Sequence, residues 1–206
     1  MAEANKYINQ YRIESTRLKG YDYGSNGGYF VTIETHQMNH YLGEVVQTCH
    51  GTSPVPIENG ESKEDHITPI TNIHVAEETH HGASILLSPI GQVVHENWLN
   101  IPKHFPFVRL DKFVIMPNHI HGILFFNKPS KQNWESNKFK STKGTLGMVM
   151  NLYKGSVKSY AKNNNIEFSW HPRYYDSIIR SDRDLNNIRN YIRNNPINWI
   201  KKESKK

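Results

Sequence analysis

The stretch Phe113-Val114-Ile115-Met116-Pro117-Asn118-His119-Ile120-His121-Gly122-Ile123-Leu124-Phe125-Phe126 is the most apolar part of the chain and decides its fold. Two runs rich in β-branched and aromatic residues, joined by Pro-Asn, predict a β-hairpin with a tight turn. Because side chains alternate across a strand, His119 and His121 should point to one face and Ile120 to the other. Two imidazoles at this spacing can share a divalent metal, but hydrogen-bonded surface histidines would give the same pattern.

Length, charge and cysteine content restrict the class of protein. A chain of 206 residues suits one domain with an insertion, and its formal net charge of +6 favours an acidic partner, nucleic acid before an anionic membrane surface. The single cysteine, Cys49, excludes an intrachain disulfide and argues against a cysteine-based zinc site. The N-terminus lacks the apolar core of a signal peptide, and no apolar run approaches the roughly 18 residues that span a bilayer. We therefore expect a cytoplasmic protein that does not bind membranes.

The remaining pattern predicts an α+β fold. Strands are expected at 29–35, 107–116, 119–126 and 174–180, with a shorter strand at 41–46. Helices are expected after an N-cap at Ser88, across 146–160 and after an N-cap at Ser181, followed by a short separate helix with a basic end beyond Pro196. This order matches a ferredoxin-like β-α-β-β-α-β sandwich with an additional C-terminal helix.

Two segments stand apart from that pattern. Residues 1–28 are predicted to form a basic N-terminal arm before a domain at 29–206, and residues 47–82 are predicted to form an irregular insertion. Basic and aromatic side chains in the arm and elsewhere are candidates for nucleic-acid contacts, although each could equally be structural or solvated. They are Arg12, Arg17, Lys19, Tyr21, Tyr23, Lys154, Lys158 and Arg173.

Tyr191 and Asn195 lie four residues apart in the last predicted helix and therefore on one face of it. Tyr191 would also serve as a tyrosine at the edge of the core, and Asn195 as the N-cap of a helix that begins at Pro196. The pair becomes informative when it is considered together with the two histidines.

Taken together, Met116-Pro117-Asn118-His119-Ile120-His121 and Tyr191-Ile192-x-x-Asn195-Pro196 resemble the single-strand-DNA tyrosine transposases with a histidine-hydrophobe-histidine motif, specifically the REP-associated tyrosine transposases. The resemblance extends through 17–23, 29–33, 101–106 and 174–180, so it covers nearly all of the chain except 47–82. Family members commonly have Trp-Gln where this chain has Trp170-His171, and often His in place of Ser177. These departures leave open which DNA sequence is preferred.

The resemblance implies a site and a reaction. His119, His121 and Asn195 would hold Mg²⁺ or Mn²⁺, which acts as Lewis acid and template for a phosphodiester. Tyr191 would attack a phosphate of single-stranded DNA near a hairpin, in a repetitive palindromic or transposon-end sequence, and form a 5′-phosphotyrosine. A phenol with a reference pKa near 10 needs a nearby cation or base for this attack. Relatives include monomers and domain-crossed dimers, so a homodimer is compatible with the resemblance.

Two other classes of protein share parts of this pattern. A catalytically silent hairpin-binding protein of the same fold would bind nucleic acid with a strong salt dependence but would have no need of the tyrosine. A metallohydrolase that uses His119 and His121 alone would need further ligands, and Gly122-Ile123-Leu124-Phe125 supplies none.

Overall fold

Four antiparallel strands form the central sheet, in the order β4-β5-β1-β6, in the computed structural model, which describes residues 18, 20–47, 82–129 and 144–204. The strands are β1 (Gly27–Glu34), β4 (Val108–Met116), β5 (His119–Phe126) and β6 (Tyr175–Ile179). The chain passes through a helix between β1 and β4 and through another between β5 and β6. The predicted ferredoxin-like arrangement is therefore confirmed.

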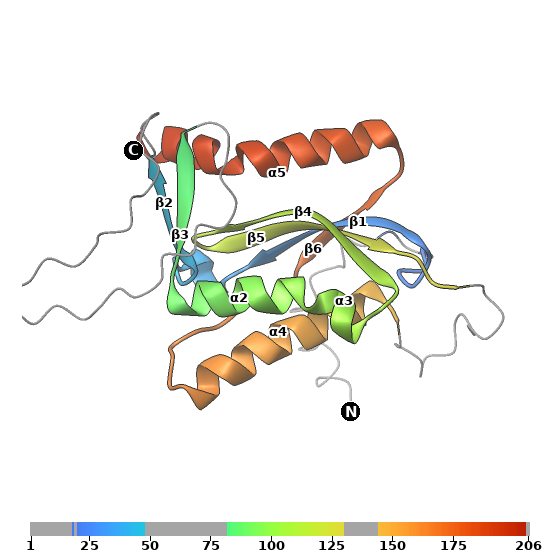
Figure 1. Cartoon of the computed structure of the whole chain (residues 1–206), viewed down its shortest axis with the longest axis horizontal. Helices are drawn as coiled ribbons and strands as arrows, with labels where there is room; N and C mark the ends of the chain where they lie inside the picture. Colours follow the sequence, from blue (N-terminus) through green and yellow to red (C-terminus); the bar gives the residue numbers. More distant parts are fainter. Residues whose placement is uncertain (1–17, 19, 48–81, 130–143, 205–206) are drawn as a thin grey trace, which may run out of the picture.

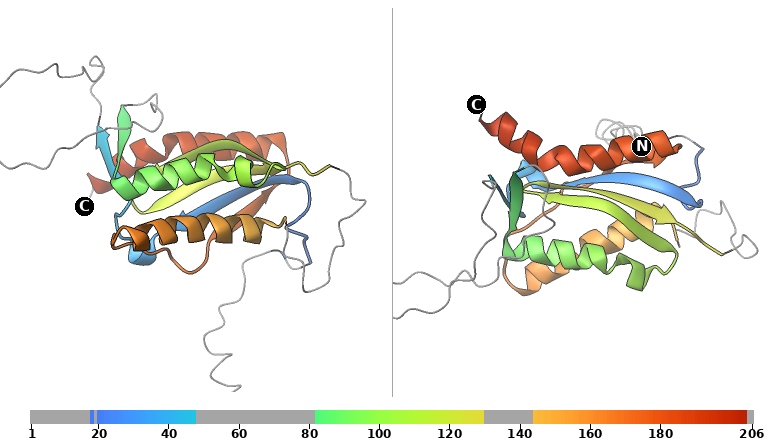
Figure 2. Two further views of the ribbon diagram at one scale, coloured as in Figure 1. Left: turned by 60° about the horizontal axis from the view of Figure 1, so that its bottom comes forward. Right: turned by 45° about the horizontal axis from the view of Figure 1, so that its top comes forward.

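Helices cover both faces of this sheet. The helices are α2 (Pro89–Leu99), α3 (Ile101–His104), α4 (Leu146–Asn163) and α5 (Asp182–Glu203). Figure 1 shows α2 and α4 on one face and α5 alone on the other, and the two views of Figure 2 show the same layers. The predicted N-caps are confirmed, since the hydroxyl of Ser88 accepts from Gly91 N and that of Ser181 from Asp184 N. None of the helices in the described ranges is long and apolar enough to cross a membrane.

Alternation along β1 supplies side chains to two separate cores. Tyr29, Val31 and Ile33 are fully buried in the larger core, which α2 and α4 complete. Phe30 points the other way, into a smaller core with Ile123 and Ile192 beneath α5. His119 and His121 of β5 point to the same side of the sheet as this smaller core, because side chains two residues apart on a strand point the same way.

The predicted hairpin of β4 and β5 is confirmed. Met116 pairs with His119 across the turn that Pro117 and Asn118 form. The pairing of β4 with β5 shifts register between Leu110 and Phe113, which is a bulge near the middle of β4. The strand therefore bends beside α5.

The segment between β1 and α2 differs from the expectation. The short strand predicted at 41–46 is present as β2 (Gly43–Gln47), but it pairs with β3 (Ala83–Leu87) in a separate two-stranded sheet. The sequence analysis assigned no strand to 83–87. Most of the predicted insertion, residues 48–81, lies outside the described residues, as do residues 1–17 and 19 of the predicted arm.

A second correction concerns the end of the chain. The short separate helix predicted beyond Pro196 is wrong, because α5 is continuous from Asp182 to Glu203 with Pro196 inside it. Asn195 is therefore not an N-cap. Proline removes one backbone hydrogen bond from a helix and strains the preceding turn. Here Ile192 and Pro196 are both buried, so packing against the sheet stabilises the helix across the interruption.

Candidate active site

His119 and His121 lie on β5 under α5, on the face that the alternation predicted. His119 pairs with Glu34 and His121 with Thr32 of β1, so both histidines lie where the two central strands pair, toward the end of β5 at which it begins. Their ring centroids are 4.5 Å apart. The His121 side chain is buried, and the ring of Phe30 stacks against it with centroids 5.5 Å apart.

Each imidazole is held through its Nδ1 atom. Thr32 Oγ1 lies 2.8 Å from His121 Nδ1, and Asn118 Oδ1 lies 2.7 Å from His119 Nδ1. The Asn118 amide donates from Nδ2 to Met38 O at 3.2 Å, which fixes its oxygen toward His119. Since a carbonyl oxygen only accepts, the neutral ring of His119 donates from Nδ1 and keeps a lone pair on Nε2. Outer contacts of this kind orient histidines that ligate metals.

Burial keeps both imidazoles neutral near pH 7. Desolvation lowers the pKa of His119 to about 4, against a smaller opposing effect of its hydrogen bond with Asn195, and the charge of Lys202 adds a further lowering. Desolvation lowers the pKa of His121 to about 3, with a smaller contribution from the charge of His119. A neutral imidazole is the form that binds a metal.

Helix α5 places three side chains above the histidines at intervals of one turn. Tyr191 Oη lies 3.1 Å from His121 Nε2, and the two ring centroids are 5.0 Å apart. Asn195 lies close enough to His119 to raise the pKa of its ring, and the centroid of the Trp199 ring lies 6.1 Å from that of His119. Tyr191 as a whole remains 49% exposed. The structure thus brings together the four residues that the sequence analysis selected for catalysis and metal binding.

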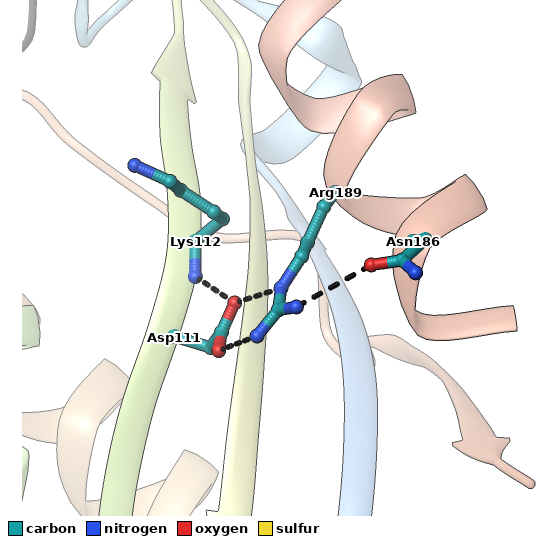
Figure 3. A network of polar contacts seen from close by, with 4 residues as sticks. All are labelled: Asp111, Lys112, Asn186 and Arg189. Atoms are coloured by element: carbon teal, nitrogen blue, oxygen red, sulfur yellow. Dashed lines mark hydrogen bonds and ion pairs between the residues drawn. The ribbon is translucent and has the colours of Figure 1, made fainter. Parts of the chain in front are cut away.

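An ion pair fastens α5 to the sheet close to Tyr191 (Figure 3). Arg189 donates to Asp111 through Nε at 2.8 Å and through Nη2 at 2.6 Å, and Lys112 N donates to Asp111 Oδ1 at 2.8 Å. The hydrogen bonds from Arg189 lower the pKa of Asp111. Two-point pairing of a guanidinium with a carboxylate fixes direction as well as distance. Because Asp111 sits at the β4 bulge, this pair sets where the first half of α5 lies.

A divalent cation at this site would have a limited choice of donors. In the described part of the chain, no group of three His, Cys, Asp or Glu side chains could hold a metal ion. The available set is therefore His119 and His121 with the amide of Asn195. The Nδ1 atom of each imidazole already has a partner, so Nε2 is the ring nitrogen that each could offer to a metal.

The predicted nucleic-acid contacts that lie within the described residues are found away from this site. Tyr21 and Tyr23 pack on Tyr29, with ring centroids 6.5 and 6.2 Å from it, and Tyr29 belongs to the core on the opposite face of the sheet. Arg12, Arg17 and Lys19 lie outside the described residues. Their contacts with nucleic acid remain predictions.

The basic residues of α4 also lie across the sheet from the histidines. Lys154 Nζ donates to His171 O at 2.7 Å and to Arg173 O at 3.0 Å, and burial lowers its pKa to about 8. This ammonium group therefore supports the loop before β6. Lys158 and Arg173 are exposed.

Several residues of the site were missed by the sequence analysis. No role in the site was predicted for Thr32, Asn118, Trp199 or the pair of Asp111 with Arg189. Only Trp199 had a usable signal, since it follows Asn195 by four residues, but the predicted break at Pro196 hid that spacing. The partnership of Thr32 with His121 depends on the pairing of β1 with β5, which local sequence does not specify.

Comparisons with known proteins agree with the fold. No protein-family model matches the chain. An uncharacterized protein of Haemophilus influenzae is 31% identical over 194 residues, which cover 90% of this chain and 88% of that protein. The chain belongs to the same family as this relative. A REP-associated tyrosine transposase, solved bound to a REP hairpin, matches with a TM-score of 0.50 and 14% identity over 90% of this chain and 74% of its own. The chain thus has a transposase-like fold.

Proposed function

We propose that this protein is a metal-dependent nuclease and strand transferase for single-stranded DNA with a hairpin, of the REP-associated tyrosine transposase type. The observation that carries the proposal is the 3.1 Å contact between Tyr191 Oη and His121 Nε2, next to His119 and Asn195. The phenol lies within hydrogen-bond distance of one of the atoms that would bind a cation. Nucleophile and electrophile would therefore meet at one point.

The reaction is written as a transesterification. Tyr191 Oη forms a bond to phosphorus, the bond from phosphorus to O3′ breaks, and O3′ leaves as a 3′-hydroxyl after it takes up a proton. The proton of the phenol passes to solvent. A bound Mg²⁺ or Mn²⁺ would supply Lewis-acid stabilisation of the phosphate charge. The phosphotyrosine keeps the ester linkage, so a later attack by a DNA hydroxyl can rejoin a strand without ATP.

The residues around the nucleophile position it rather than react. Arg189 and Asp111 fix the helical turn that precedes Tyr191, and Phe30 packs edge-on against the tyrosine ring with centroids 6.2 Å apart. Thr32 and Asn118 fix the two imidazoles from beneath. Such restraint reduces the motion that the reacting groups must lose before reaction.

The test uses a pool of single-stranded oligonucleotides, each with one stable hairpin between randomised flanks, with Mn²⁺ or Mg²⁺. A 5′-phosphotyrosine attaches the protein to the 3′ fragment. A 3′ label should therefore migrate with the protein on a denaturing gel, and a 5′ label should appear in a free fragment. Tyr191→Phe should abolish the adduct, while Tyr160→Phe, which changes a 43% exposed tyrosine of α4, should preserve it.

Two outcomes would overturn the proposal. If Tyr191→Phe forms as much adduct as the parent, the nucleophile is wrong. If the parent binds the oligonucleotides at low salt but forms no adduct with either metal, the protein is a hairpin-binding protein of the same fold. The metal is tested separately, by titration of Mn²⁺ without DNA. Replacement of His119 and His121 by Gln should then remove the binding.

A further inference from the structure

Aromatic rings continue past the histidines, on the side away from Tyr191. Successive ring centroids are 5.0 Å apart from Tyr191 to His121, 4.5 Å from His121 to His119, 6.1 Å from His119 to Trp199, and 5.4 Å from Trp199 to His40. On α5, Tyr191 precedes Asn195 by one turn and Trp199 follows it by one turn. The metal-ligand candidates thus lie between a nucleophile and an aromatic pair.

The two members of that pair are fixed in different ways. Trp199 is partly exposed and packs against the small core beneath α5, to which β2 and β3 contribute Val45 and Ile85. His40 is exposed and follows a turn at 36–38. Trp199 is therefore both supported by packing and partly exposed, as a platform for a nucleobase would be.

The backbone of the 36–40 turn is strained and is fastened to the active site. Gln37 and Met38 have φ angles of 51° and 56°, in the left-handed region that few residues other than glycine adopt. Asn118 donates to Met38 O and, through its own oxygen, holds His119. Non-glycine residues persist in this region where surrounding contacts enforce the conformation. The position of His40 is thus linked to that of His119.

A cation accompanies the aromatic pair. Lys202 follows Trp199 by three residues on α5 and is exposed. Residues three apart on a helix are neighbours on its surface, so Lys202 and Trp199 lie on the same side of α5. A stacking ring with a neighbouring cation suits the two parts of a nucleotide, the base and the phosphate.

The direction of the reaction indicates which nucleotide of the substrate would lie at Trp199. In phosphoryl transfer the attacking and leaving oxygens lie roughly in line on opposite sides of phosphorus. With Tyr191 on the His121 side, the leaving O3′ faces the side of Trp199. We propose that Trp199 and His40 hold the unpaired base of the nucleotide whose O3′ is released, and that Lys202 binds the phosphate on the 5′ side of that nucleotide. This inference rests on the proposed function and adds the polarity of the bound strand.

The test compares abasic substrates. An oligonucleotide that forms the adduct is prepared with the base removed either from the nucleotide immediately 5′ of the cleaved bond or from the nucleotide immediately 3′ of it. On intact DNA at subsaturating concentration, Trp199→Ala should slow adduct formation about 5- to 150-fold, as expected for the loss of one stacked base. On DNA without the 5′ base, the parent and Trp199→Ala should react at equal rates. On DNA without the 3′ base, Trp199→Ala should again form the adduct more slowly than the parent, by the same factor as on intact DNA.

Matched variants separate stacking from folding. Trp199→Phe keeps a ring and should retain most of the activity, and His40→Ala changes an exposed side chain and should show the same selective loss as Trp199→Ala. The inference is overturned if the rate defects of Trp199→Ala and His40→Ala disappear on DNA without the 3′ base instead of on DNA without the 5′ base. It is also overturned if the defects are equal on both abasic substrates. Absence of any adduct from the parent on intact DNA would instead overturn the proposed function.

Discussion

The neutrality of the two imidazoles predicts that folding stability falls as the solution is acidified. His119 and His121 have pKa values of about 4 and about 3 in the folded protein, against about 6.5 in an unfolded chain. Groups with a depressed pKa in the folded state bind fewer protons there than in the unfolded state. Stability should therefore be unaffected by these groups above about pH 7 and should fall as the pH drops from about 6.5 toward 4.

The size of this loss follows from the two pKa values. At pH 5 an unfolded histidine is almost fully protonated while neither buried ring is, so each contributes at most about 2 kcal/mol of lost stability. His119 is partly exposed, which reduces its share. We expect a total on the order of 3 kcal/mol between pH 7.5 and pH 5. The lowered pKa of Asp111 changes stability mainly below pH 5, and the lowered pKa of Lys154 changes it mainly above pH 7.5.

Urea denaturation at pH 7.5 and at pH 5, followed by circular dichroism without added metal, measures this difference. The control is the variant in which both histidines are replaced by Asn. Whatever its absolute stability, its free energy of unfolding should differ much less between the two pH values. If the free energy of unfolding changes equally between the two pH values in the parent and the variant, the imidazoles titrate normally. The description of the site as two neutral ligands would then be wrong.

Other predictions concern the supports of the site. Asp111→Asn weakens the two-point ion pair with α5, so amide hydrogens of α5 should exchange faster while the central sheet keeps its protection; unchanged exchange would show that packing alone holds the helix. Thr32→Val removes a hydroxyl group without changing side-chain shape and should weaken Mn²⁺ binding about 10- to 100-fold in calorimetric titration. Unaltered affinity would show that the hydroxyl does not orient the ligand. A Cβ at Gly122 overlaps the indole of Trp98, so Gly122→Ala should lower the unfolding free energy by about 1–3 kcal/mol in urea, whereas Gly155→Ala, which has open space, should not.

Local periodicity predicted the halves of the site but not their connections. The two-residue spacing placed His119 and His121 on one strand face, and the four-residue spacing placed Tyr191 and Asn195 on one helix face. Both are properties of a single element. The partnership of Thr32 with His121 depends on the register between β1 and β5, which are far apart in the chain and are aligned by packing.

The errors have similar physical causes. Pro196 after Asn195 is typical of a new helix, but burial of Ile192 and Pro196 stabilises one continuous helix instead. Strand β3 was not predicted because its partner β2 lies before residues 48–81. Local sequence patterns do not indicate pairing between strands that are this far apart in the chain. The predicted break at Pro196 also left Trp199 in a separate tail, although it lies on the same side of α5 as Tyr191.

The central claim is that Tyr191 becomes covalently joined to DNA at the site of the two histidines. Tryptic digestion of the protein–DNA adduct, followed by nuclease treatment and mass spectrometry, tests it most directly. Cleavage after Arg189 and Arg193 releases the peptide 190–193, which contains one tyrosine. We predict that this peptide carries the nucleotide phosphate, and that it does so only when a divalent metal was present. A nucleotide found on another tyrosine, such as Tyr160 or Tyr175, would contradict the assignment of the active site.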